Sequence, residues 1–137
     1  MLSARKKTLR EHMQTNANEP VADLRQPLIE IVIESWRLAK LFQRVLGKLD
    51  AAESNRYANQ VRYFQKRVDD TLALTGMRLV SLEGHPYDPG MAVTPLNIAD
   101  FGPDDMLVVE QMMEPILMGP EGIVKSGTVL LKQAGQL

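Results

Sequence analysis

The sequence predicts an α+β protein: an antiparallel helix pair at residues 21–77 that dimerises into a four-helix bundle, followed by a small β-domain at residues 78–137. Two observations carry this prediction. Apolar residues recur at steps of three and four up to about Thr75, which is the period of a helix. After Gly76 the period changes to two, and short β-branched segments alternate with Gly, Pro and Asp, as in a compact sheet.

The composition is that of an ordinary globular protein. Of 137 residues, 45% are hydrophobic and 24% are charged, which suffices for one domain or two small modules. The net charge of -1 gives no general attraction to nucleic acid or anionic membrane. The absence of cysteine excludes disulfides and thiolate chemistry. No apolar run approaches the roughly 20 residues that span a bilayer, so we expect a cytoplasmic protein without membrane or nucleic-acid partners.

Residues 1–20 are polar and mixed in charge, and we expect a flexible tail. Their basic run, Arg5, Lys6, Lys7 and Arg10, leaves contact with an acidic partner open as an alternative. The segment lacks the apolar core of a signal peptide.

The first helix is expected from about Val21 to the region of Gly47 and Asp50. Its heptad-like seam consists of Leu28, Ile31, Ser35, Leu38, Phe42, Val45 and Leu49. Further apolar residues, among them Trp36 and Ala39, widen this seam beyond a two-stranded stripe. A helix that is apolar on several sides must be covered by more than one neighbour.

The second helix is expected at residues 52–75, with Gly76 as its C-cap residue. Because the connection is short, the two helices should be antiparallel neighbours. Two helices cannot cover the first one fully, so we predict a homodimer. The alternative is that the C-terminal half folds back over the helices. The predicted dimer interface consists of Leu28, Ile31, Leu38, Phe42, Val45, Val61, Phe64 and Val68.

The β-domain is expected to contain four to six strands, within segments such as "MRLVSL", "MLVVEQMM" and "IVKSGTVLL", with a strand end and turn in "PILMGPEG". In the middle segment, strict alternation places Met112 on the same face as Glu110 and Glu114. That face is expected to be wet, which makes Met112 a candidate exposed apolar contact, although methionine more often fills a core.

The residues that could carry catalysis or bind a metal are few. His85 lies near Asp88, and three further aspartates follow at positions 100, 104 and 105. No metal-ligand spacing and no nucleophile motif accompanies them, and aspartates beside Gly and Pro are typical of turns. We therefore expect turns in this region, no catalytic residue, no metal and no cofactor, while a small hydrolase or metal enzyme remains a distant alternative.

With these elements in place, the chain resembles the GrpE family, the nucleotide exchange factors of DnaK-type chaperones. The segment "GHPYDPGMAV" is similar to the family's entry into its β-domain, through Gly84, Tyr87, Asp88, Pro89, Ala92 and Val93. The segment "VVEQMMEPILMGPEGIVKSGTVLL" follows the family's strand-turn-strand layout. In "LIEIVIESWRLA", Arg37 occupies the position of an arginine in the family's first bundle helix.

The resemblance covers residues 22–132 and implies a fold, a partner and an activity. It implies a dimeric helix bundle with a β-wing that binds the ATPase domain of a DnaK-type chaperone and promotes ADP release, without enzymatic chemistry. It assigns the partner contacts to Arg37, Met112, Glu114, Lys125 and Leu131. The family's Gly-Tyr turn is replaced by Pro115 and Ile116, which leaves open an adaptor that binds a non-chaperone partner without exchange activity.

Overall fold

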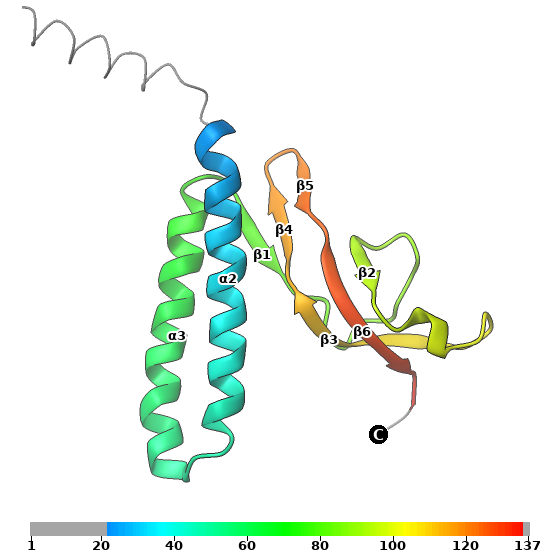
Figure 1. The fold of residues 1–137 in the computed structure, drawn as a ribbon, viewed down its shortest axis with the longest axis horizontal. Coiled ribbons are helices and arrows are strands. Elements are labelled where there is room, and N and C mark those ends of the chain that lie inside the picture. The colour runs from blue at the N-terminus through cyan, green and yellow to red at the C-terminus, as the bar shows by residue number, and fades with distance from the viewer. Residues whose placement is uncertain (1–21, 136–137) are drawn as a thin grey trace, which may run out of the picture. The chain divides into compact units, whose positions relative to one another are not determined.

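The computed structural model describes residues 22–135, so the predicted tail at residues 1–20 lies outside the described residues. The described residues divide into two units between Val32 and Ile33, and the packing described below lies within the unit that begins at Ile33. In the described residues, helices α2 and α3 precede short strands (Figure 1), and the α+β class predicted from the sequence is confirmed.

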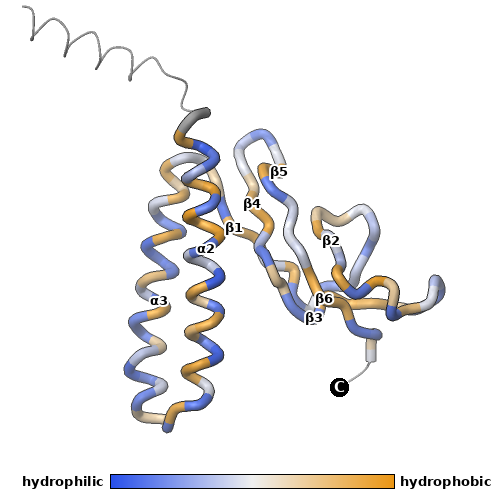
Figure 2. Tube along the Cα trace, viewed as in Figure 1, coloured by the Kyte–Doolittle hydropathy of each residue, from blue (hydrophilic) through white to orange (hydrophobic). Residues whose placement is uncertain are grey.

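The helix pair consists of α2 (Ala22–Leu46) and α3 (Ala51–Ala73), close to the predicted ranges. Between them, Asp50 caps α3 by accepting a hydrogen bond of 2.9 Å from the backbone N–H of Glu53. Apolar residues recur along both helices (Figure 2). The two helices share a small core in which Ala39 and Leu46 of α2 pack with Val61 of α3.

Within residues 22–135, six short strands form two three-stranded sheets, in the orders β1-β4-β5 and β2-β6-β3. Their pairs are antiparallel except β2 with β6, which is parallel. A 3-10 turn, η1, lies at Ile98–Asp100. The strands are β1 (Arg78–Val80), β2 (Val93–Pro95), β3 (Leu107–Glu114), β4 (Ile116–Gly119), β5 (Gly122–Lys125) and β6 (Gly127–Gln133).

One long hairpin passes from one sheet to the other. Pro115 separates β3 from β4, and Ser126 separates β5 from β6, so each arm changes sheet at one residue. The segment at residues 123–131, expected as one strand, is therefore two. We call the bend at Ser126, between β5 and β6, the corner. Gly127, the first residue after it, is buried, and a Cβ there would lie 2.7 Å from the backbone oxygen of Glu114. The corner thus requires a residue without a side chain.

The core of the β-domain gathers side chains from both sheets. Trp36 of α2 packs against it as a partly buried neighbour, so the alternative in which the C-terminal half covers the helices holds for this part of α2. The buried residues of this core are Val93, Val109, Met112, Ile116, Val129 and Leu131.

The turn-rich segment "GHPYDPG" is tied to β3 by backbone hydrogen bonds. Gly84 donates to Val109 at 2.8 Å, Val109 donates to His85 at 2.9 Å, and Tyr87 donates to Leu107 at 2.8 Å. Gly84 has a φ of 81°, which favours glycine. The segment therefore extends the sheet at β3 and places the half-buried Tyr87 against the core.

Asn97 fixes the central strand of the second sheet. Its amide nitrogen donates to the carbonyl of Leu131 at 2.8 Å, and its oxygen accepts the Leu131 N–H at 2.9 Å. Such a two-bonded amide imitates a neighbouring strand and satisfies backbone groups that β6 would otherwise leave unpaired.

Candidate functional site: an ionic cluster and two grooves beside α2

Two cations predicted to contact a partner both pair with a carboxylate that carries the same prediction. The guanidinium of Arg37 lies 3.3 Å from Glu114 Oε2, and Lys125 Nζ lies 2.8 Å from the same atom. Arg37 also pairs with Glu34, one turn earlier on α2. We call Arg37, Glu114 and Lys125 the ionic cluster; its members come from α2, β3 and β5.

The strand register brings the ionic cluster together. Glu114 ends β3 opposite Thr128 of β6, whose hydroxyl lies 3.5 Å from Glu114 Oε1. Lys125 ends β5 immediately before the corner at Ser126. Because both arms of the hairpin bend at the same level, the ends of β3 and β5 come within reach of each other.

The pKa of Glu114 lies below its usual range. The first cause is the hydrogen bond from Lys125, and the positive charges of Lys125 and Arg37 add to it, against an opposing effect of burial. The side chain is 24% exposed, whereas those of Arg37 and Lys125 are 46% and 39% exposed. Glu114 is therefore an ionised carboxylate fixed by two ion pairs. The two cations, Arg37 and Lys125, remain accessible to solvent and to a partner.

The prediction that Met112 is exposed is wrong. Its side chain is only 2% exposed and belongs to the β-domain core. The reason is a break in the alternation of β3: the register shifts between Val109 and Gln111, and again between Met112 and Glu114. Bulges insert an extra residue and turn the following side chains to the other face. Val109 and Met112 therefore both point inward, although they are three residues apart.

Leu131 also lies in the core, with 1% of its side chain exposed. It faces inward from the central strand of its sheet, β6, between β2 and β3. Neither Leu131 nor Met112 is available as a surface contact in this structure.

The residues predicted for a dimer interface divide into three groups. Val61 is 8% exposed and packs against α2 of its own chain, which leaves little of its side chain for contact with a second chain. Leu28 and Val68 are half-buried. The remaining five have exposed side chains: Ile31, Leu38, Phe42, Val45 and Phe64.

Three of these exposed residues form a continuous apolar line on α2. Leu38, Phe42 and Val45 follow steps of four and three and are 60%, 40% and 43% exposed. Residues at such spacing share one helix face. We call these three residues the α2 stripe.

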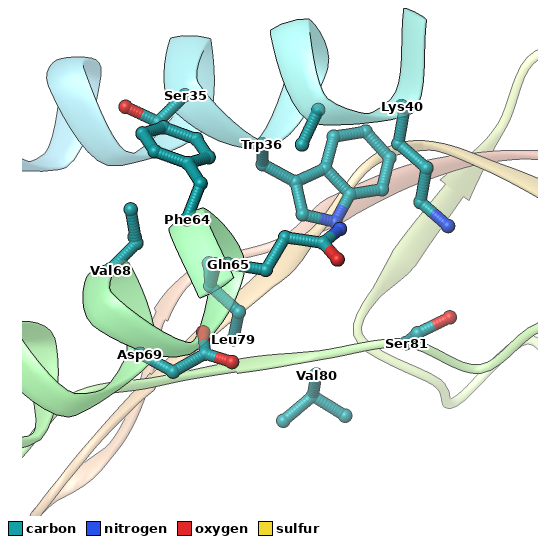
Figure 3. Close-up of a pocket in the computed structure, with 11 residues that line it drawn as sticks. Ser35, Trp36, Lys40, Phe64, Gln65, Val68, Asp69, Leu79, Val80 and Ser81 are labelled. Atoms are coloured by element: carbon teal, nitrogen blue, oxygen red, sulfur yellow. The ribbon is translucent and has the colours of Figure 1, made fainter. Parts of the chain in front are cut away.

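A groove of about 280 Å³ lies beside Trp36 (Figure 3). We call it the helix groove. Trp36 and Lys40 line it from α2, while Phe64 and Asp69 line it from α3. Burial raises the pKa of Asp69, and the neighbouring charge of Asp70 adds to the rise. The third side consists of β1 and the residue after it, namely Leu79, Val80 and Ser81.

A second groove, of about 210 Å³, also lies beside α2 and shares Trp36 and Lys40 with the helix groove. We call it the basic groove. Of its cations, only Arg37 was predicted from the sequence to contact a partner, whereas Lys40 and Arg44 were given no role. Lys40 follows Arg37 by three residues and Arg44 follows Lys40 by four, and this spacing was the available signal, because it places all three on one face of α2. Its lining consists of Trp36, Arg37, Lys40, Leu41, Arg44, Met112 and Met113.

The aspartates near His85 act in turns, as the sequence indicated. Asp88 accepts a hydrogen bond of 3.1 Å from the backbone of Gly90, and Asp105 accepts one of 2.8 Å from that of Gly102. Within residues 22–135, no group of three or more acidic or histidine side chains is arranged to hold a metal ion. In the same range, neither helix has the length and hydrophobicity needed to cross a membrane.

Comparison of the chain with protein-family models, with curated proteins and with solved structures finds no match.

Proposed function

We propose that this protein is a homodimeric, GrpE-like nucleotide exchange factor that binds the ATPase domain of a DnaK-type chaperone and promotes release of ADP. The observation that carries the proposal is the ionic cluster. The resemblance assigns Arg37, Glu114 and Lys125 to the chaperone-facing surface from three separate segments, and both cations lie within 3.3 Å of the same carboxylate.

The order of the elements supports the same proposal. The resemblance implies a helix pair followed by a compact β-domain, and α2 and α3 precede the six strands in this chain. The segment matched to the family's entry into the β-domain, residues 84–93, is tied to β3 by backbone hydrogen bonds.

The proposed mechanism is one of differential affinity, without covalent chemistry. The factor binds the open, nucleotide-free chaperone more tightly than the closed, ADP-bound form, and by reciprocity it weakens ADP binding by the same factor. A hundredfold effect requires about 2.7 kcal/mol of differential binding. Arg37 and Lys125 are accessible to solvent, and their charge-assisted hydrogen bonds to the chaperone can together supply this binding free energy.

The homodimer of the proposal forms through the α2 stripe. Leu38, Phe42 and Val45 leave an apolar face uncovered in the single chain. Exposed apolar lines of heptad spacing associate with a second copy because this removes their surface from water. Two helix pairs then form a four-helix bundle.

The test is release of a fluorescent ADP analogue from a DnaK-type chaperone of the same organism. We expect the protein to accelerate release in a saturable manner, and Lys125→Ala to reduce the acceleration at least about tenfold. Lys132→Ala is the matched control, since Lys132 is a half-buried lysine on the neighbouring strand outside the ionic cluster. No acceleration by a confirmed dimer would reject the exchange function.

A second candidate is a GrpE-like adaptor that binds a non-chaperone partner without exchange activity. The burial of Met112 and Leu131 favours it, because the surface around the ionic cluster then lacks two apolar contacts that the resemblance assigns. Under this candidate, the same assay shows no acceleration of ADP release, while Lys125→Ala still weakens capture of the true partner.

A further inference from the structure

The basic groove combines positive charge with an apolar floor. Arg37, Lys40 and Arg44 line it together with Trp36 and Met113, and no carboxylate is part of its lining. Met112 and Leu41 complete the lining, and Leu41 is 54% exposed. A surface of this kind leaves both its cations and its apolar atoms in contact with water.

The charges of the groove are only partly compensated within the chain. Arg44 has no hydrogen bond or ion pair with any other side chain among residues 24–135. The amine of Lys40 lies 5.4 Å from the centre of the Trp36 ring and 4.0 Å from Glu83 Oε1. That oxygen already accepts the backbone N–H of Met112 at 3.0 Å. Arg44 therefore remains free to pair with an incoming anion, and Lys40 is held only by a long ion pair of 4.0 Å to a shared oxygen.

We propose that the basic groove docks an acidic segment of a partner protein. An apolar side chain of the segment contacts Trp36 and Met113, and flanking carboxylates pair with Arg37, Lys40 and Arg44. Charge complementarity favours an acidic ligand, because three cations share one helix face and no acid lines the groove. Arg37 and Lys40 pair with Glu114 and Glu83 outside the lining, and Arg44 is unpaired among residues 24–135. Arginine and lysine around an aromatic floor are the side chains expected to recognise carboxylates beside an apolar anchor.

A peptide fits these features better than a nucleic acid. The whole chain has a net charge of -1, which provides no long-range attraction to a polyanion. The other accessible side chains of the groove, Leu41 and Met113, are aliphatic or thioether and suit an apolar side chain.

The basic groove and the proposed dimer face can be occupied together. Arg37, Lys40 and Arg44 follow steps of three and four, whereas Leu38 and Phe42 of the α2 stripe are each displaced from them by one or two residues. One residue corresponds to about 100° around a helix, so the stripe lies on the neighbouring face. The docking site is therefore separate from the dimer face, whereas Arg37 belongs both to the groove and to the ionic cluster.

The test uses a fluorescein-labelled synthetic peptide in which glutamates alternate with leucines, and a second peptide with glutamines in place of the glutamates. Binding is followed by anisotropy and by the emission of Trp36, which is the only tryptophan of the chain. We expect the acidic peptide to bind, to shift the Trp36 emission and to weaken from about 50 to about 300 mM salt. The glutamine peptide should bind at least about tenfold more weakly.

Two variants and one control locate the site. Arg44→Glu should weaken the acidic peptide at least about tenfold and Lys40→Gln about threefold, with unchanged circular dichroism. Arg67→Glu, an equal charge reversal at an exposed position of α3, should have less than about a twofold effect.

Three results would overturn the proposal. They are equal affinity for both peptides, equal losses for Arg44→Glu and Arg67→Glu, and absence of acidic-peptide binding at about 1 mM. A labelled oligothymidylate that binds more tightly than the acidic peptide and is lost in Arg44→Glu would assign the groove to nucleic acid instead.

Discussion

Arg37 of α2 and Glu114 of β3 form an ion pair of 3.3 Å that joins the helix pair to the end of the long hairpin. Glu114 also holds Lys125 at 2.8 Å, so one carboxylate organises two cations from separate elements. The functional proposal and the first prediction both follow from this arrangement.

The first prediction concerns the pH dependence of the ionic cluster. The pKa of Glu114 is lowered below its usual value of 4.5, so the ionised form stabilises the fold. This contribution is present above about pH 4.5 and is lost as the pH falls through the lower folded-state pKa. We expect Glu114→Gln to reduce the free energy of unfolding by about 1 kcal/mol at pH 7. Urea unfolding at several pH values should show the difference from wild type shrinking towards about pH 3.

The control is Asp70→Asn. Asp70 pairs with Lys66 at 2.7 Å on the exposed surface of α3, where both side chains are more than half exposed. Such pairs contribute about 0.3–0.5 kcal/mol. An equal loss in the two variants would contradict the special position of Glu114.

The second prediction concerns the side chain on which sequence reasoning failed. Met112 is buried, so Met112→Ala should leave a cavity and cost about 2–5 kcal/mol of stability. Thermal unfolding should show this as a clear fall in Tm. Met106→Ala is the control, because Met106 is 78% exposed and should lose almost nothing. A stable Met112→Ala variant would contradict the bulged register of β3.

These outcomes show what the sequence could and could not reveal. The two helices were predictable because their apolar period is sustained over many residues and Asp50 marks the start of α3. The C-cap residue of α3 is Leu74 and not Gly76 as predicted; Gly76 follows two residues later with a positive φ of 77°. The bulges of β3 were not, since a register shift leaves no mark in an alternating pattern. Met112 was therefore assigned to the wrong face.

The ionic cluster could be predicted from the sequence as three residues, but not as one site. Arg37, Glu114 and Lys125 were each identified from the sequence, but only by a resemblance that treated them as separate contacts. Their meeting depends on the corner between β5 and β6, and a residue pattern does not state where a strand bends. Lys40 and Arg44 had a helical spacing as their signal, but the groove beside them exists only in three dimensions.

The third prediction tests the corner itself. A Cβ on Gly127 would lie 2.7 Å from the Glu114 carbonyl oxygen, 2.9 Å from Met112 Cε and 3.2 Å from Ile116 Cγ1. The first contact is with backbone, which cannot move aside cheaply. Gly127→Ala should therefore cost about 1–3 kcal/mol and lower the Tm.

Gly90→Ala provides the matched control. Its new Cβ would meet only Asp88, at 3.8 Å, and Gly90 does not have a positive φ. Its Tm should stay close to that of wild type. Equal stability of Gly127→Ala and Gly90→Ala would show that the two arms of the hairpin do not pack as closely as the structure has them.

The fourth prediction concerns association through the α2 stripe. Leu38 is 60% exposed in the single chain, so Leu38→Glu should leave the fold of each chain intact. In the proposed dimer the same side chain is buried, and a glutamate there places an unpaired charge in an apolar interface, at a cost of several kcal/mol. We expect wild type to be a dimer by light scattering at micromolar concentration and Leu38→Glu to be a monomer with unchanged circular dichroism.

Leu96→Glu, at a site 59% exposed in the β-domain, should remain a dimer. A monomeric wild type would remove the dimer from the proposal, and a dimeric Leu38→Glu would move the interface to another surface.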